Sequence, residues 1–198
     1  MNARLLHRDV QEFLNENLDK DLDRVIFRGS PFPGISIQEL AEQIQSRRKC
    51  RSKLPMWYRT PGIVYPPKLS IEQASSEKTS QYKASLISGK NLADLSGGFG
   101  VDAYFFSQRF NQVLYCEANE NLMQVAKHNF EVLGAKNIRC LSDDSIRHLK
   151  NSNESYDWIY LDPARRNDAS PSAAARYVVS TRCAPLVSTS TGWPSASN

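Results

Sequence analysis

The sequence predicts an α/β fold in which a small helical domain precedes a parallel sheet of about four strands. Apolar segments of strand length alternate with segments of helical periodicity over the range 70–166. A glycine-rich turn follows the first of these apolar segments, whereas the residues before position 70 show helical spacing alone. Because strands joined through helices run parallel with a right-handed connection, we expect helices on both faces of the sheet.

The range 1–69 predicts a helical domain that ends in a basic, proline-rich connector. Helical spacing begins near Val10 and again after Ser36, a plausible helix cap, and the loop 29–34 separates the two patterns. The basic run that follows carries candidate nucleic-acid contacts, namely Arg47, Arg48, Lys49, Arg51, Lys53, Trp57 and Arg59. Cations of this kind bind a phosphate backbone and an aromatic ring stacks a base, but a solvated linker is the alternative.

The range 70–166 predicts the sheet. Ser70 is the expected cap of a helix that extends to Ile87. The expected strands are 91–95, 112–116, 137–141 and 156–161, with helices between them. This arrangement favours the strand order 3-2-1-4, which leaves the fourth strand at an edge.

The range 167–198 does not continue this pattern. Ser, Ala and Thr dominate it, it contains no Lys and no Glu, and its one apolar run is Tyr177-Val178-Val179. We expect a mostly disordered tail, which a truncation or a change of reading frame explains.

The composition is ordinary for a folded protein with a mild excess of positive charge. Of 198 residues, 40% are hydrophobic, and the net charge of +4 permits RNA as a partner without requiring it. No apolar run approaches the roughly 18 residues that cross a membrane, and a signal-peptide pattern is absent. The 4 cysteines form no CxxC pair, so we expect no metal site and a reducing cytoplasm. The oligomeric state has no signal in the sequence.

The turn after the first predicted strand is the candidate cofactor site. Glycines let a backbone approach a ligand closely, and the following helix points its N–H groups and its positive dipole end at that ligand. The candidate residues in this segment are Asp94, Ser96, Gly97, Gly98, Phe99 and Gly100. A tight turn with no ligand is the alternative for the glycines, and helix capping is the alternative for Asp102.

Acidic residues follow the other predicted strands at the edge where such sheets bind ligands. Glu117 follows the second strand, and its carboxylate suits a ribose diol. Asp143 or Asp144 follows the third strand and suits an adenine amino group, although both could cap the next helix. Asp94 suits an ammonium group. A ligand with a cationic amino-acid end, a ribose and an adenine satisfies all of these acids, and S-adenosylmethionine is such a ligand.

A nicotinamide dinucleotide is the competing cofactor, because the segment 98–103 matches G-x-G-x-x-[GA]. Against it, Asp94 would place a negative charge near the pyrophosphate, and the Asp162-Pro163 pair has no role in a dehydrogenase. An NAD(P)-dependent oxidoreductase therefore stays open as an alternative. A third possibility is a cofactor-binding module without turnover.

With these motifs the chain resembles class I S-adenosylmethionine-dependent methyltransferases, whose core is Rossmann-like. The segment 94–100 looks like the glycine-rich first motif of that family, Glu117 lies at the position of its ribose-binding acid, and 162–165 resembles its Asp/Asn-Pro-Pro-aromatic motif. The segments 65–70, 72–77 and 82–85 resemble a bacterial subgroup with a helical domain before the core and a THUMP-like domain after it, and we expect the latter domain to be missing here.

The resemblance implies methyl transfer to RNA or a related acceptor. Asp162 and the carbonyl of Pro163 would hold an acceptor amine, and Arg165, which replaces the aromatic residue, would stack on the base. The resemblance also implies that the helix 70–87 lies beside the cofactor. Ser76, Thr79 and Lys83 are then candidates for lining it, with a packed or solvated helix face as the alternative.

Overall fold

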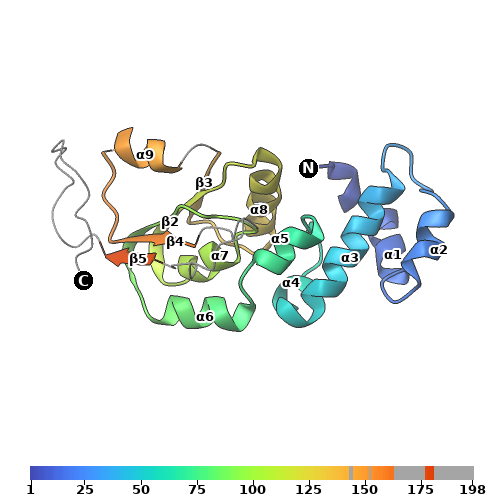
Figure 1. The fold of residues 1–198 in the computed structure, drawn as a ribbon, viewed down its shortest axis with the longest axis horizontal. Coiled ribbons are helices and arrows are strands. Elements are labelled where there is room, and N and C mark those ends of the chain that lie inside the picture. The colour runs from blue at the N-terminus through green and yellow to red at the C-terminus, as the bar shows by residue number, and fades with distance from the viewer. Residues whose placement is uncertain (143–144, 152, 163–176, 181–198) are drawn as a thin grey trace, which may run out of the picture.

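The structure is a computed structural model that describes residues 1–142, 145–151, 153–162 and 177–180. The helices are η1 (Ala3–Leu6), α1 (Arg8–Glu16), α2 (Leu22–Phe27), α3 (Ile37–Lys53), α4 (Pro55–Arg59), α5 (Lys68–Gln73), α6 (Glu77–Ser85), α7 (Val101–Ser107), α8 (Glu120–Val132) and α9 (Ser145–Asn151). The strands are β1 (Gly89–Asp94), β2 (Phe110–Cys116), β3 (Ile138–Leu141), β4 (Trp158–Leu161) and β5 (Tyr177–Ser180). Figure 1 shows α1 to α4 at one end of the molecule and the sheet at the other.

The described strands form one sheet in the order β3-β2-β1-β4-β5. The first four run parallel, which confirms the predicted order 3-2-1-4. The prediction that the fourth strand lies at an edge is wrong, because β5 pairs with it in the antiparallel direction. This strand lies inside the range 167–198 that was expected to be a tail, and it is the short run of β-prone residues noted there. The rest of that range lies outside the described residues.

The two faces of the sheet have different packing partners. Alternate residues of β1 and β2, such as Leu92 and Val113, belong to a large buried cluster that also contains residues of α7 and α8. On the opposite face, Ala93, Leu114 and Cys116 form a smaller cluster. The large cluster extends without interruption from Leu5 to Tyr160 and so joins the N-terminal helices to the sheet.

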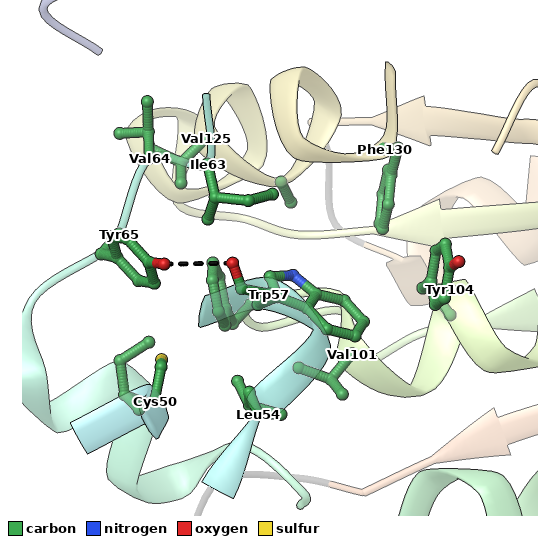
Figure 2. Packing of buried hydrophobic residues seen from close by; sticks show 14 of the residues in the cluster. Cys50, Leu54, Trp57, Ile63, Val64, Tyr65, Val101, Tyr104, Val125 and Phe130 are labelled. Atoms are coloured by element: carbon green, nitrogen blue, oxygen red, sulfur yellow. Dashed lines mark hydrogen bonds between the residues drawn. The ribbon is translucent and has the colours of Figure 1, made fainter. Parts of the chain in front are cut away.

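Trp57 lies at the centre of this shared cluster. It is 1% exposed, and its ring makes an edge-on contact with Tyr104 at a centroid distance of 5.0 Å. Figure 2 shows the hydrogen bond that the hydroxyl of Tyr65 donates to the carbonyl of Trp57, 3.1 Å long. The expectation that Trp57 stacks a nucleic-acid base is therefore corrected. Burial of so large an apolar ring in the core stabilises the fold by about 2–3 kcal/mol. This free energy would be lost if the ring left the core to stack on a base.

The connector before α5 is extended, as expected, but it is buried. Val64 donates to Oδ1 of Asn129 over 3.0 Å and accepts from Nδ2 of the same side chain over 2.8 Å. Tyr65 exchanges the corresponding pair of bonds with Gln43, at 3.0 and 2.5 Å. The two amide side chains thus act as strand partners for a segment with no neighbouring strand.

The predicted helix from Ser70 to Ile87 is two helices, α5 and α6. Ser70 lies inside α5 and does not cap it, whereas Ser76 caps α6 by accepting from the backbone N of Thr79 over 3.2 Å. α5 ends where its C-cap Ala74 turns to extended backbone angles, and the Ser76 cap begins the next helix. This break turns α6 against α7, beside the turn that follows β1.

Candidate functional site

The glycine-rich turn lies tightly against β2 and α8. A Cβ on Gly97 would lie 2.6 Å from the carbonyl oxygen of Cys116, and one on Gly100 would lie 2.5 Å from the ring of Phe130. Gly98 and Gly100 have φ values of +56° and +82°, in the left-handed region that other residues disfavour. The fold itself therefore requires these three glycines, and Gly100 is also the N-cap of α7.

The other residues of the first motif separate into two groups. Phe99 is 2% exposed and packs in the large cluster, so its side chain faces the core and the expectation of a ligand contact is corrected for that side chain. Asp94 and Ser96 are polar and adjacent to the turn. Asp143, Asp144, Pro163 and Arg165, which the sequence also nominated, lie outside the described residues.

Glu117 is held against the glycine turn from the end of β2. Its Oε2 accepts from the backbone N of Gly98 over 2.9 Å, and its Oε1 accepts from the backbone N of Asn119 over 2.8 Å. These bonds fix the orientation of the carboxylate. Because each carboxylate oxygen can accept a second hydrogen bond, Glu117 retains the capacity to bind a diol.

Asp94 is a buried carboxyl group at the end of β1. It is 1% exposed, and its Oδ1 accepts from the backbone N and from Oγ of Ser96 over 3.0 and 3.2 Å. Burial raises the pKa of Asp94 to about 7, the hydrogen bond from the Ser96 backbone opposes the rise, and the charge of Asp102 adds to it. In the part of the chain that the structure describes, Oδ2 accepts no hydrogen bond. Such a group favours a cationic ligand.

Ser96 joins the ends of β1 and β4. Its hydroxyl lies within hydrogen-bond distance of Asp94 and accepts from the backbone N of Asp162 over 2.8 Å. The acids of the first and fourth predicted strands are therefore brought to the same turn, as their positions in the sequence predicted.

A polar cluster surrounds the side chain of Asp162. Its Oδ2 lies 3.1 Å from the hydroxyl of Tyr160 and 3.4 Å from Nζ of Lys83. Nζ of Lys83 also forms an ion pair of 2.8 Å with Asp102, which lies in the first turn of α7 and is not its N-cap. Asp102 accepts further hydrogen bonds from Ser75, Ser80 and Tyr160, at 3.0, 2.6 and 3.0 Å.

Sequence reasoning missed half of this cluster. Lys83 was only a weak candidate, and Tyr160, Ser75 and Ser80 were not candidates at all. One signal was present, because Ser80 and Lys83 are three residues apart and so share a face of α6. Ser76 and Thr79 lie at the start of α6, where their hydroxyl groups are 2.9 Å apart.

Several cations of the basic run bind within the protein. Arg48 donates to the carbonyls of Asn17, Leu18 and Lys20. Arg51 pairs with Asp19 at 2.9 Å. Lys49 pairs with the carboxylate of Glu72 at 3.4 Å, and Lys53 donates to its backbone carbonyl over 2.7 Å.

Arg47 and Arg59 differ from the other cations of the run. Arg47 lies over the ring of Tyr58 at 5.6 Å, and Arg59 is exposed. The run is therefore part of the folded helical layer and not a solvated linker.

The described residues contain neither a metal-binding cluster nor a membrane-spanning helix. No group of three or more His, Cys, Asp or Glu side chains among them is placed to hold a metal ion. None of the helices in the described ranges is long and apolar enough to cross a membrane.

Comparison with known proteins identifies the fold. No family model matches the chain. A provisionally assigned methyltransferase of Porphyromonas gingivalis W83, known from a crystal structure, aligns with a TM-score of 0.70 and 28% identity over 83% of this chain and 42% of its own. An uncharacterised RNA methyltransferase of Mycoplasma mobile is 30% identical over 77 residues, which are 39% of this chain and 21% of that protein.

The chain has the α/β Rossmann-like fold of methyltransferases, as the likeness to the Porphyromonas protein shows. It spans less than half the length of both relatives. Trm5b of Pyrococcus abyssi aligns with a TM-score of 0.37 and 15% identity over 50% of this chain and 27% of its own.

Proposed function

We propose that this chain is the donor-binding part of an S-adenosylmethionine-dependent methyltransferase that acts on RNA. One observation carries the proposal. Acidic residues at the ends of three parallel strands, Asp94, Glu117 and Asp162, lie around one glycine turn. The carboxylate of Asp94 and the backbone N of Asp162 both contact the Ser96 hydroxyl, and the carboxylate of Glu117 accepts from the backbone N of Gly98. The likeness to the Porphyromonas methyltransferase supports the same class of activity.

The residues present fit this cofactor. Glu117 would take the ribose diol, and Asp94, with its buried carboxyl and open Oδ2, would face a positive charge. S-adenosylmethionine supplies an activated methyl group, so a strong general base is not needed for an amine acceptor. The task that remains for the protein is placement, and Asp162 would orient the acceptor by accepting its hydrogen bond.

RNA is the proposed acceptor. The Mycoplasma relative is an RNA methyltransferase, and the net charge of +4 is compatible with a polyanion. Of the basic run, Arg47 and Arg59 remain the candidates for backbone contacts. The other cations, Arg48, Lys49, Arg51 and Lys53, bind partners within the fold. Membership of the bacterial subgroup that the sequence resembles and a cytoplasmic location belong to the same proposal.

Calorimetric titration with S-adenosylmethionine, S-adenosylhomocysteine and NAD tests the cofactor. We expect both adenosyl ligands to bind and NAD to bind at least tenfold more weakly. Glu117→Ala should weaken adenosyl binding by about tenfold or more, since it removes two hydrogen bonds to a charged group. Glu120→Ala makes the same charge change in the first turn of α8 and serves as the control. Preference for NAD would overturn the assignment.

Transfer of a labelled methyl group to total cellular RNA tests the acceptor. Binding of S-adenosylhomocysteine without any transfer would favour the second candidate, a cofactor-binding module without turnover. Binding of RNA that weakens steeply with added salt would support phosphate contacts by the basic run.

A further inference from the structure

Lys83 places a positive charge beside the proposed acceptor site. Its side chain is only 12% exposed, and its Nζ lies 2.8 Å from Oδ2 of Asp102 and 3.4 Å from Oδ2 of Asp162. Nζ is also 2.8 Å from Oγ of Ser75 and 2.5 Å from the hydroxyl of Tyr160. These contacts fix the ammonium group. Because the site is largely buried, water and salt screen its field less than at the surface.

The proposed function puts the methyl donor next to this ammonium. An acceptor atom that Asp162 orients lies within hydrogen-bond distance of its carboxylate, and the methyl group must touch that atom. The sulfonium centre of the donor then lies within roughly 10 Å of Nζ. The donor is positively charged at sulfur, whereas S-adenosylhomocysteine is neutral at the same atom.

We propose that Lys83 is a specificity-determining residue that weakens the binding of the charged donor relative to the uncharged product. The inference rests on the proposed function. At distances of 8–10 Å and an effective dielectric constant of about 20–40, Coulomb's law gives roughly a four- to thirtyfold effect on the ratio of the two affinities. Asp102 acts in the opposite direction, because its carboxylate offsets the ammonium charge.

The test is calorimetric titration of the full chain and its variants with three ligands. These are S-adenosylmethionine, S-adenosylhomocysteine and sinefungin, which carries an amine in place of the sulfonium. We expect Lys83→Met to shift the affinity ratio toward S-adenosylmethionine by about tenfold, with sinefungin following the donor. Lys83→Arg keeps the charge and should leave the ratio near that of the parent protein. Asp102→Asn should shift the ratio the other way.

The outcomes separate the two proposals. An unchanged ratio in Lys83→Met, or shifts of the same sign in Lys83→Met and Asp102→Asn, overturns the role of Lys83 and leaves the methyltransferase assignment intact. Failure of the parent protein to bind any adenosyl ligand overturns the proposed function itself. Circular dichroism checks the fold of each variant. Should Lys83→Met not fold, Lys83→Gln makes the same charge change, and Asp102→Asn tests the opposite sign independently.

Discussion

Asp94 is a buried carboxyl group, and burial disfavours its charged form. Its ordinary pKa of 3.8 is raised to about 7 in the folded protein, chiefly by burial. The unfolded chain therefore loses this proton near pH 4, while the folded chain keeps it until about pH 7. The contribution of Asp94 to the free energy of unfolding is therefore fully present below pH 4 and is lost as the pH rises to 7.

Replacement of Asp94 by Asn should remove this pH dependence. Since each pKa unit corresponds to about 1.4 kcal/mol, we expect Asp94→Asn to become more stable relative to the parent protein by a few kcal/mol between pH 5 and pH 8. Urea unfolding at several pH values measures the difference. The exposed Asp23→Asn is the control. A constant difference between Asp94→Asn and the parent protein across this range contradicts the account.

Gly97 and Gly98 offer a second comparison at single residues. Alanine at Gly97 places a Cβ 2.6 Å from a backbone carbonyl oxygen, which cannot move without distorting β2. Alanine at Gly98 has space, with its closest neighbour at 3.6 Å, and meets only the left-handed φ. We expect Gly98→Ala to cost about 1–2 kcal/mol and Gly97→Ala to cost more and to abolish adenosyl binding. Equal losses of stability and binding would show that the turn is not pressed against β2.

At the scale of elements, the amide side chains of Gln43 and Asn129 hold the connector between the helical layer and the sheet. Gln43→Glu and Asn129→Asp each lose the N–H donor to a buried carbonyl and bring a carboxylate close to it. We expect each to cost about 2–4 kcal/mol in the free energy of unfolding. Gln45→Glu, an exposed change on the same helix as Gln43, should cost less than about 0.5 kcal/mol. Similar losses of stability in Gln43→Glu and Gln45→Glu would show that the Gln43 amide does not hold the connector.

At the scale of the whole molecule, the shared cluster predicts one unfolding transition. Trp57 packs α4 against α7, so in a variant with Trp158 and Trp193 replaced by Phe its fluorescence reports the junction, whereas circular dichroism reports the helices. We expect the two probes to give the same midpoint in urea. Separate midpoints would mean that the N-terminal helices fold independently of the sheet.

The parts of this architecture that were predictable are those set by local pattern. Apolar periodicity located the four parallel strands, and topology then placed Glu117 and Asp162 at the same edge as Asp94. Contacts set by tertiary packing were not predictable. The ion pair between Lys83 and Asp102 depends on how α6 packs on α7, and burial of Trp57 overrides its polar surroundings in the sequence. The strand β5 was missed because its short apolar run lies alone in a Ser-, Ala- and Thr-rich range, outside the alternating pattern of strands and helices.

A crystal structure with S-adenosylhomocysteine bound tests the central claim most directly. The account predicts the adenosyl group at the turn 97–100, with both ribose hydroxyls donating to Glu117 and the ammonium group on the side of Asp94. Ligand bound elsewhere, or at this turn with Glu117 directed away from the ribose, would contradict it.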